Sequence, residues 1–481
     1  MARICTQYSG LMRRENGMQR SRVHVRAATQ LSEPPSKQEE EQSFRAHIDF
    51  KFIRDNLDLI TQNCRDRHVT ADPEKVVRLY NDFLELVQEA DGLRAARNEN
   101  STAMKKKLGD EERQQLIEKG KQLKEELDGL ECRLNDIETQ LQIEGKRLPN
   151  LTHPEVPHGG EEHAVELKVI GSKREFEFGP KDHVSLGEAL DVLDFESGSI
   201  VSGTKFYYLK KEAALLELAL VNYTMQKIYQ KGFVPMITPD LVRGSVLEKC
   251  GFQPRGEGTQ IYSVQDSQLC LTGTAEIPLG GVFMDQILQQ EDLPIKVAAF
   301  GRCFRTEAGA AGTAGKGLYR VHQFSKVEMF VVCTPEQSEA LHQELMELEV
   351  EMYQELGLHF KVLDMPSGDL GAPAYRKFDV EAWMPGLSRY GEISSASNCT
   401  DYQSRRLNIR YRPNPPSTSN GGQKKKKKTP TQFVHTLNAT GCAVPRMIVA
   451  ILENFQQDDG SVVIPEALRP FMMGISRISR A

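Results

Sequence analysis

The sequence predicts an α+β protein in which an antiparallel coiled-coil arm of two helices precedes a larger domain of strands and helices. Two observations lead to this fold class. Over residues 72–148, apolar residues recur at alternating spacings of three and four, which is typical of a two-helix seam. Over residues 298–330, two runs typical of half-buried strands flank a glycine-rich loop. The chain therefore combines a long helical part with a β-hairpin.

The composition is that of an ordinary globular chain, with 39% hydrophobic and 27% charged residues. A length of 481 residues leaves room for two or three domains. The net charge is 61 − 67 = −6, so any nucleic-acid contact must come from local basic patches. No apolar run approaches the ~20 residues of a membrane-spanning helix, and we expect no membrane partner. Nine cysteines without CxxC or zinc-type spacing indicate small core residues in a reducing compartment.

Residues 1–30 contain six arginines and a single acidic residue, Glu15. This composition is typical of a mitochondrial or chloroplast transit peptide, and it does not distinguish the two organelles. The alternative is a tail without an address, which would leave the protein in the cytoplasm. Residues 31–44 are rich in proline and glutamate and predict a disordered linker. We therefore expect the fold to begin at about residue 45, after a transit peptide and linker over 1–44.

The first predicted domain, residues 45–158, is dominated by the helical hairpin. Asp72 followed by Pro73 predicts a helix start, because an acid suits the cap and proline suits the first turn. Gly109 and Asp110 mark the turn between the two helices. The predicted seam consists of Val76, Tyr80, Phe83, Val87 and Ala90 in the first helix and Leu116, Gly120, Leu123, Leu127, Leu130, Leu134, Ile137 and Leu141 in the second. Two such runs joined by one turn fold back on each other.

Positive charge gathers at the tip of this hairpin. Residues 93–124 hold nine Lys and Arg against five acids, a balance of +4, although the whole of 73–148 has 14 against 17. The basic residues nearest the turn are Arg94, Arg97, Lys105, Lys106, Lys107 and Arg113. A basic tip on an acidic stem suits contact with a phosphate backbone, and a merely solvated tip is the alternative.

The second predicted domain spans residues 159–481, after a hinge-like linker of prolines and glycines at 153–160. A long apolar helix over 207–230 and an edge strand near 233–239 follow. Residues 413–431 form a predicted insertion with a five-lysine run, Lys424–Lys428. We interpret this run as a solvated surface loop; accessory contact with an RNA stem and a nuclear address are the alternatives.

The β-hairpin carries the most specific motif. Phe304-Arg305-x-Glu307, a glycine-rich loop and then Arg320-Val321-His322-Gln323-Phe324 present arginines and one carboxylate to a polyanion. This order resembles motif 2 of the class II aminoacyl-tRNA synthetases. The segment Thr306–Gly312 is similar to the version found in seryl-tRNA synthetases.

Other segments carry the same resemblance in chain order. The helix and strand over 207–239 resemble motif 1, which implies a homodimer. Thr274–Glu276 resembles the serine-binding loop, Glu392–Ser395 a block that binds ATP and metal, and residues 433–446 resemble motif 3. The resemblance covers about residues 45–481. It implies a class II catalytic domain with an antiparallel sheet flanked by helices, and an arm that binds tRNA(Ser).

The resemblance further implies a ligase that forms seryl-adenylate and pyrophosphate from ATP and L-serine, and then transfers serine to tRNA(Ser). Its implied catalytic residues are Arg305, at the α-phosphate and the serine carboxylate, and Arg446, at the γ-phosphate. Fixed guanidinium groups stabilise charge that builds up during phosphoryl chemistry. The implied ATP-binding residues are Arg305, Thr306, Glu307, Val321, Phe324, Glu392, Ile393, Ser394, Ser395 and Arg446. Glu392 and Ser395 are the implied ligands of Mg²⁺.

The implied serine-binding residues are Thr274, Ala275, Glu276, Arg305, Glu328 and Thr440. Glu276 would hold the ammonium group, and Glu328 would act as a buried acceptor that rejects substrates without a hydroxyl. Thr440 stands where the family often has serine, and it keeps the hydroxyl. Each carboxylate also has a plainer interpretation: Glu276 as a surface residue in a turn, and Glu328 as a strand residue paired with Lys326.

Two other functions stay open. One is a paralogue that activates an amino acid but charges a carrier, and the basic tip of the hairpin argues against it. The other is a non-catalytic RNA-binding or interaction protein on the same fold. That function predicts loss of the arginines and carboxylates named above, and all of them are present.

Overall fold

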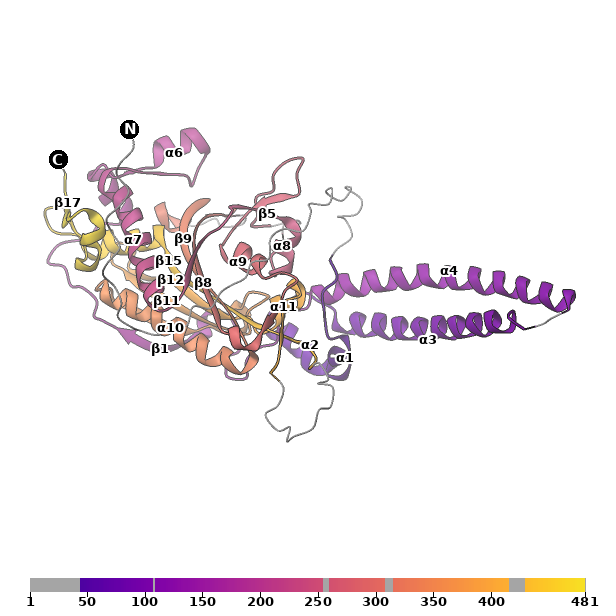
Figure 1. Ribbon diagram of the computed structural model, residues 1–481. Coiled ribbons are helices and arrows are strands. Elements are labelled where there is room, and N and C mark those ends of the chain that lie inside the picture. Colours follow the sequence, from indigo (N-terminus) through magenta and orange to yellow (C-terminus); the bar gives the residue numbers. More distant parts are fainter. Residues whose placement is uncertain (1–43, 107–108, 254–258, 308–314, 415–428, 481) are drawn as a thin grey trace, which may run out of the picture. The chain divides into compact units, whose positions relative to one another are not determined.

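The computed structural model describes residues 44–106, 109–253, 259–307, 315–414 and 429–480 (Figure 1). The predicted transit peptide and the Lys424–Lys428 run lie outside these residues. The α-helices are α1 (Phe50–Asp55), α2 (Leu57–Asp66), α3 (Pro73–Ala103), α4 (Asp110–Lys146), α5 (His183–Ala189), α6 (Phe195–Ser202), α7 (Lys211–Gln230), α8 (Gly244–Lys249), α9 (Glu276–Val282), α10 (Ser338–Glu355), α11 (Tyr402–Leu407) and α12 (Val444–Asn454).

The strands are β1 (Val165–Ile170), β2 (Leu193–Asp194), β3 (Tyr208–Leu209), β4 (Val234–Ile237), β5 (Leu241–Arg243), β6 (Leu269–Leu271), β7 (Ile287–Gln289), β8 (Ile295–Phe304), β9 (Gln323–Cys333), β10 (Phe360–Asp364), β11 (Arg376–Met384), β12 (Arg389–Asn398), β13 (Arg410–Arg412), β14 (Gln432–Phe433), β15 (His435–Ala443), β16 (Val462–Val463) and β17 (Arg477–Ile478). In the described part of the chain, no helix has the length and apolar character needed to cross a membrane.

The helical hairpin consists of α3 and α4 and begins as predicted. The Asp72 carboxylate accepts a hydrogen bond from the backbone N–H of Lys75 at 2.8 Å, and Pro73 is the first helical residue. Leu86 and Ala90 of α3 pack with Leu127 and Leu130 of α4. The predicted seam position Val87 is only half-buried, and Leu86 takes its place. Between Phe83 and Ala90, a step of three then four selects Leu86, and a step of four then three selects Val87. Spacing alone therefore does not distinguish Leu86 from Val87.

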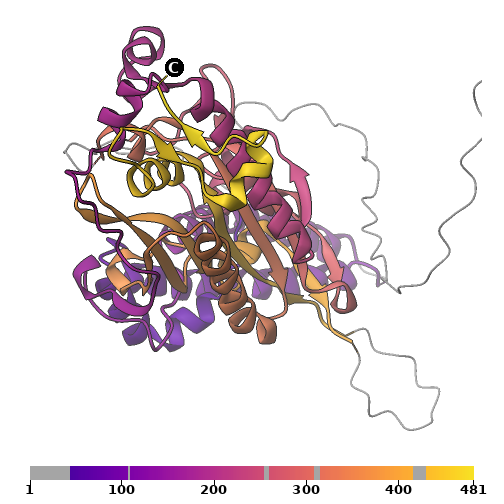
Figure 2. The ribbon, with the colours of Figure 1, turned by 90° about the vertical axis from the view of Figure 1, so that its left-hand side faces the viewer.

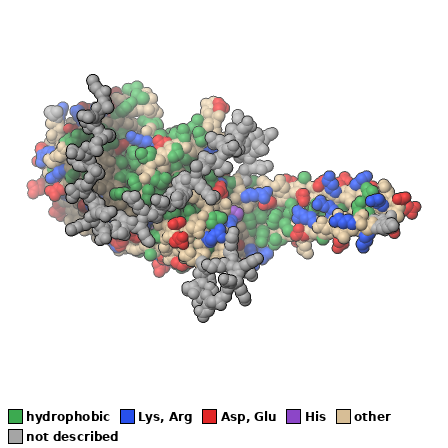
Figure 3. Space-filling model, in the orientation of Figure 1, with side chains coloured by type: hydrophobic (Ala, Val, Ile, Leu, Met, Phe, Trp, Pro, Cys, Tyr) green, Lys and Arg blue, Asp and Glu red, His purple; other side chains and the backbone are tan. Residues whose placement is uncertain are grey.

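The outer half of the hairpin is polar. The Asn100 amide donates to the Leu116 carbonyl at 2.9 Å, and a side chain at Gly120 would meet that amide at 3.1 Å. Glycine at this seam position therefore leaves room for the Asn100 amide. In Figure 3, Lys and Arg side chains gather over this half, and apolar side chains lie nearer the base. Arg94 pairs with Asp91 and Glu131, whereas Arg97, Lys105, Lys106 and Arg113 are exposed.

The larger part of the chain is built on an eight-stranded sheet in the order β1-β10-β11-β12-β15-β9-β8-β4. Every pairing is antiparallel except the last, in which β4 runs parallel to β8. The predicted strands around the glycine-rich loop are β8 and β9, paired from Ile295–Val332 to Phe304–Gln323. The α+β fold class is therefore confirmed.

The two faces of the sheet bury different cores, as the alternation along β9 shows. Val327, Met329 and Val331 face the core formed with α7, α10 and α12, and α7 and α10 lie in front of the strands in Figure 2. Phe330 and Val332 face a second core formed with α8, α9 and α11. Glu328 shares the parity of Phe330, so it lies on this second face. That face carries the polar site described below.

The segment predicted as a linker is packed against the sheet domain. The backbone N–H of His153 donates to the Tyr375 carbonyl at 3.0 Å, and Val156 is buried with Leu370 and Ala374. Just before it, the Asn150 amide donates to the carbonyls of Pro373 and Cys399, both at 2.9 Å. These contacts fix the end of the helical part to loops at the ends of β11 and β12.

Candidate active site

An open cavity with about 580 Å³ of empty space lies where β9, β12 and β15 meet the first turn of α12. Ten of the predicted site residues line it: Arg305, Glu307, Val321, Phe324, Glu392, Ile393, Ser394, Ser395, Thr440 and Arg446. Leu318, Tyr319, Arg320, Lys326, Ala443 and Pro445 complete the lining. Segments up to 141 residues apart in the chain, from Arg305 to Arg446, therefore share one cavity, whose charged groups are four cations and two carboxylates.

Arg305 directly follows β8 and is held at both backbone and side chain. Its N–H donates to the His322 carbonyl at 2.9 Å, and its carbonyl accepts from His322 Nδ1 at 2.9 Å. The Nε and Nη2 atoms lie 3.4 Å from the Gly273 carbonyl, and the guanidinium lies 5.2 Å from the Phe324 ring centre. A positive charge thus lies at the wall of the cavity, and none of the carboxylates in the described part of the chain forms an ion pair with it.

The neighbours of Arg305 take different directions. The Thr306 hydroxyl donates to the Thr259 carbonyl at 2.6 Å, so it anchors the backbone of residues 259–260 and does not line the cavity. Glu307 lines the cavity in a left-handed conformation with φ of 51°, and its Oε2 lies 3.5 Å from Arg320 Nε. A left-handed glutamate is uncommon, which marks this turn as constrained.

Arg446 is the third residue of α12, after Pro445 in the first turn. Its Nη1 donates to the carbonyl and to Oε2 of Glu392, both at 3.0 Å, and its Nε donates to the Tyr319 carbonyl at 3.3 Å. The guanidinium also lies 4.7 Å from the Tyr319 ring centre. Burial alone would lower the pKa of Arg446, but the Glu392 carboxylate outweighs it and leaves that pKa raised. Both partners therefore stay charged near neutral pH.

Glu392 and Ser395 reach the same cavity because β12 contains a bulge. Val380 pairs with Ser394 and Glu381 pairs with Glu392, so Ile393 has no partner across the strands. Such an extra residue re-aims the side chains around it, and bulges are frequent next to active sites. Loss of water around Glu392 would raise its pKa, but the Arg446 charge outweighs this effect and the pKa is lowered.

A buried charged cluster lies at the inner end of the cavity. Lys326 and Glu328 form an ion pair and are 8% and 2% exposed at their side chains. The Thr440 hydroxyl lies 3.5 Å from Glu328 Oε2, and these two residues face each other across β15 and β9. Directly after Thr440 the strand register slips at Gly441, where a side chain would meet Ile228 at 2.8 Å. The plainer interpretation of Glu328, a pair with Lys326, describes its contact here.

Glu276 is buried, so its plainer interpretation as a surface glutamate is wrong. Its Oε1 accepts from the Gln403 amide at 2.5 Å and from the Asn438 amide at 3.0 Å. Burial raises the pKa of Glu276 to about 7, and the negative charge of Glu328 adds to the effect. The Thr274 hydroxyl accepts from the Glu276 N–H at 3.3 Å, and Ala275 is 3% exposed. A carboxylate with a pKa of about 7 thus accepts hydrogen bonds from two other segments, α11 and β15.

Sequence reasoning assigned no site role to several of these residues, including the following four. Tyr319 and Lys326 line the cavity, and Gln403 and Asn438 hold Glu276. Two signals were present. Lys326 stands two residues before Glu328 on one strand, which places both on one face. Asn438 stands two residues before Thr440 on β15, with the same consequence.

Comparison with known proteins defines the class first. A family model described as the tRNA synthetase class II core domain (G, H, P, S and T) matches residues 261–455, which contain the whole cavity. A second model, described as the seryl-tRNA synthetase N-terminal domain, matches residues 48–152, which contain the helical hairpin. The fold is therefore that of a class II aminoacyl-tRNA synthetase, a ligase.

Individual relatives identify the family within this class. A serine–tRNA ligase of Treponema denticola is 49% identical over 434 residues, which are 90% of this chain and 100% of that protein. A serine–tRNA ligase of Rubrobacter xylanophilus is 47% identical, covering 88% of this chain and 97% of its own. The crystal structure of a Pyrococcus horikoshii seryl-tRNA synthetase complexed with ATP matches with a TM-score of 0.82 and 35% identity, over 90% of this chain and 100% of that one. The chain belongs to the seryl-tRNA synthetase family.

Proposed function

We propose that the chain activates L-serine with ATP, forming seryl-adenylate and pyrophosphate, and then transfers the seryl group to tRNA(Ser). The single observation that carries this proposal is the cavity itself: Arg305 and Arg446 line the same space as Thr440, with the buried Lys326–Glu328 pair at its inner end. Two separated cations suit a triphosphate. A small polar recess beside them suits an amino acid with a hydroxyl.

Arg305 takes the α-phosphate and the serine carboxylate in this proposal, and Arg446 takes the γ-phosphate. When the carboxylate attacks the α-phosphorus, negative charge grows on the phosphoryl oxygens. The Arg305 guanidinium stabilises this charge, because His322 fixes the Arg305 backbone and the guanidinium lies against the Gly273 carbonyl. No protein nucleophile is required, because positioning and charge supply the catalysis.

The adenine base lies beside Glu307, Val321 and Phe324 in this proposal. Glu307 is placed to accept from an amino group once Arg320 releases it, since their contact of 3.5 Å is long. Phe324 offers a ring face and Val321 an apolar wall, and both line the cavity. Thr306 supports the turn through its bond to the Thr259 carbonyl.

A magnesium ion fits the oxygen donors present. Glu392 is an ionised carboxylate, and the Ser395 hydroxyl lines the same cavity. Among the described residues, no cluster of three or more His, Cys, Asp and Glu could hold a metal. Two protein donors suit an ion that keeps waters and shares substrate phosphates, as Mg²⁺ does. When bound, the ion would neutralise phosphate charge.

L-serine is placed between Arg305 and the buried cluster. Glu276 holds its ammonium group as a carboxylate, and the Thr274 hydroxyl orders the turn that carries Glu276. Glu328 and Thr440 recognise the substrate hydroxyl. Burial raises the pKa of Glu328, and the Lys326 charge opposes that rise. A site that must hydrogen-bond a hydroxyl discriminates strongly against substrates that lack one.

Partner surfaces lie outside the cavity. Leu218 and Tyr229 of α7 and Val234 and Ile237 of β4 are between 54% and 95% exposed, which supports a homodimer through this face. The exposed cations at the end of the hairpin support contact with tRNA(Ser). The arginine-rich residues 1–30 support import into a mitochondrion or chloroplast.

Amino-acid-dependent ATP–pyrophosphate exchange tests the proposal. We expect exchange with serine, and at least about 100-fold less with alanine and glycine, since both leave buried polar groups unpaired. Threonine keeps the hydroxyl but is larger than serine, so its rate of exchange shows how strictly the site limits the size of the side chain. Absence of exchange with every amino acid, from folded protein that still binds tRNA, would leave the RNA-binding function in its place.

A further inference from the structure

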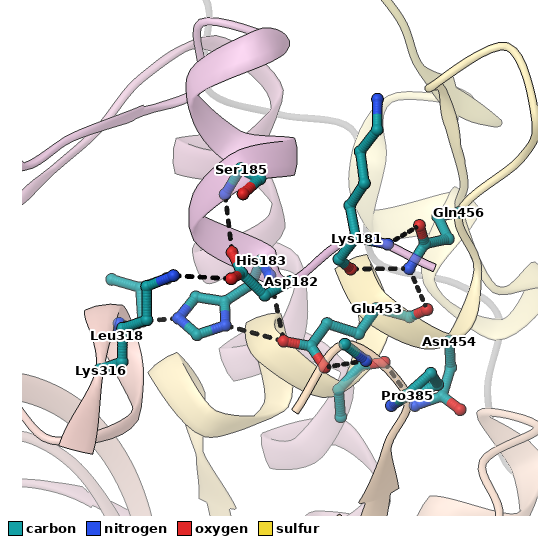
Figure 4. Close-up of polar contacts among 12 residues, drawn as sticks. Lys181, Asp182, His183, Ser185, Lys316, Leu318, Pro385, Glu453, Asn454 and Gln456 are labelled. Carbon is teal, nitrogen blue, oxygen red and sulfur yellow. Dashed lines mark hydrogen bonds and ion pairs between the residues drawn. The ribbon is translucent and has the colours of Figure 1, made fainter. Parts of the chain in front are cut away.

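A buried histidine connects four segments beside the cavity (Figure 4). His183, the first residue of α5, and Glu453 of α12 are both fully buried at their side chains, and Nδ1 lies 2.9 Å from Glu453 Oε1. The backbone N–H of His183 donates to the same oxygen at 3.0 Å, and the Gly386 N–H donates to Glu453 Oε2 at 2.9 Å. On the other side of the ring, the Leu318 N–H donates to Nε2 at 3.1 Å.

These contacts fix the chemical form of the imidazole. A backbone N–H can only donate, so Nε2 must be the unprotonated nitrogen that accepts from Leu318. The proton is therefore on Nδ1, where it is donated to Glu453. Glu453 receives three N–H donors, two from His183 and one from Gly386, which suits a carboxylate that only accepts. The ring is neutral and held in one tautomer.

Two glycines allow a close approach of the chain, Gly317 at the His183 ring and Gly386 at the backbone just before it. A side chain at Gly317, whose φ is +61°, would lie 2.2 Å from His183 Nε2. A side chain at Gly386 would lie 2.5 Å from the Asp182 backbone. A separate ion pair, at 2.7 Å, joins Lys316 to Asp182, the residue before His183. The chain thus approaches the histidine closely from two loops.

The hydrogen bond from Leu318 connects His183 to the wall of the cavity, because Leu318 lines it. Leu318 and Tyr319 belong to one 3₁₀ turn, Gly317–Tyr319, at the end of the segment that follows Glu307. The Tyr319 carbonyl accepts from Arg446 Nε, and its ring lies 4.7 Å from the same guanidinium. The Tyr319 ring also fills the space beside Gly391, where a side chain would meet it at 2.8 Å. The place of Tyr319 therefore depends on the turn that His183 holds.

We infer that His183 is a positioning residue for Arg446: locked by Glu453, its Nε2 holds the Leu318 N–H and so sets the place of Tyr319, against which Arg446 is fixed. The inference rests on the proposed assignment of Arg446 to the γ-phosphate of ATP. It assigns to His183 no contact with substrate. Its consequence is specific, because loss of the Nε2 acceptor weakens ATP binding and leaves serine binding unchanged.

Two amide substitutions test the roles of the two ring nitrogens, Nδ1 and Nε2, independently. Asparagine at 183 places its amide near the position of Nδ1, so His183→Asn keeps a donor for Glu453 and loses the acceptor for Leu318. Glutamine reaches the position of Nε2, so His183→Gln keeps the acceptor and loses the donor. We expect His183→Asn to raise the Kd for ATP about tenfold or more, since it leaves a buried N–H unpaired, with KM for serine unchanged. His183→Gln stays within about threefold of the wild type.

Gln456→Leu is the matched control for stability. Gln456 is buried and exchanges two hydrogen bonds with the Lys181 backbone, at 2.8 and 2.9 Å, but does not reach Leu318. It should lower Tm and leave the Kd for ATP within about threefold. Equal shifts of Kd in the two His183 variants, or a Kd that follows Tm across all three, would overturn the inference. Wild-type protein that binds ATP but exchanges no amino acid would refute the proposed function, while the ratio of Kd values would still decide the role of His183.

Discussion

The helical hairpin and the catalytic cavity are stabilised in opposite ways. In the hairpin, Leu86 and Ala90 meet Leu127 and Leu130 through apolar contacts that repeat along two helices. In the cavity, Arg446 of α12 meets Glu392 of β12, 54 residues earlier in the chain, and Lys326 pairs with Glu328 on the same strand, β9. Apolar contacts add up one by one, whereas removal of one member of a buried ion pair leaves its partner uncompensated. Substitutions in the hairpin should therefore cost stability alone. In the cavity, substitution of an unpaired cation such as Arg305 should cost chemistry, and substitution within a buried pair should cost both.

Arg305→Ala is expected to have the largest effect. Removal of a fixed positive charge at the developing negative charge should lower kcat for serine-dependent exchange by about 10²–10³-fold. Tm should change little, since among the described residues the guanidinium contacts the Gly273 carbonyl at 3.4 Å and the Phe324 ring at 5.2 Å, and forms no ion pair. Arg305→Lys keeps the charge but loses the planar fork, so its kcat should lie between those of the wild type and Arg305→Ala. Full activity of Arg305→Ala in exchange kinetics would remove this residue from the mechanism.

Leu127→Ala should act on the hairpin alone. Leu127 is 3% exposed, and a buried leucine truncated to alanine costs about 2–5 kcal/mol. We expect faster amide hydrogen exchange over 73–146, with kcat for ATP–pyrophosphate exchange within about twofold of wild type. Leu84→Ala is the control, because that leucine is 37% exposed. A fall in exchange activity that accompanies hairpin opening would contradict the separation of the two regions.

The pH dependence of serine activation should follow Glu276. Its pKa is raised from 4.5 to about 7, so the folded protein holds a proton that the unfolded chain has already released. The stability contributed by this group therefore falls as pH rises from about 4.5 to about 7. The carboxylate proposed to bind the ammonium group forms around this pKa of about 7. We expect kcat/KM for serine to rise about tenfold between about pH 6 and pH 8.

Glu276→Gln supplies the control for that profile, since it keeps the shape and cannot titrate. Its kcat/KM should be low and flat over the same range of pH. A variant profile that still rises around pH 7 would assign the titration to another group.

Thr440→Ser should have the smallest effect. The hydroxyl that lies 3.5 Å from Glu328 is retained and only a methyl group is lost, so KM for serine should stay within about threefold. Thr440→Val keeps the volume and removes the hydroxyl, and it should raise KM about tenfold. Steady-state exchange kinetics distinguish the two, and equal KM values would exclude the hydroxyl from recognition.

The same contrast explains what the sequence could predict. The start of α3 at Asp72 and Pro73 and the pairing of β8 with β9 follow from local residue patterns, and both are confirmed. The choice of Leu86 over Val87 was not predictable, because both satisfy the spacing. Motifs identified ten of the cavity residues, and their roles stay predictions.

What the sequence did not predict depends on pairing across the sheet. The bulge at Ile393 brings Glu392 and Ser395 to one cavity, and the slip at Gly441 follows Thr440. Neither the bulge nor the slip could be predicted from neighbouring residues in the sequence, because the register of a strand is set by the strands that pair with it. The amide contacts that Gln403 and Asn438 make with Glu276 likewise arise from segments more than 100 residues away.

The division between the two regions can be tested in one preparation. A variant with Arg97, Lys105 and Lys106 all replaced by Gln removes exposed charge at the end of the hairpin. Serine-dependent ATP–pyrophosphate exchange and charging of tRNA(Ser) should be measured side by side over a range of salt concentrations. We predict unchanged exchange, a KM for tRNA raised at least about tenfold, and a salt slope reduced by about one for each lost phosphate contact. Loss of exchange in this variant, or charging equal to wild type, would contradict the account.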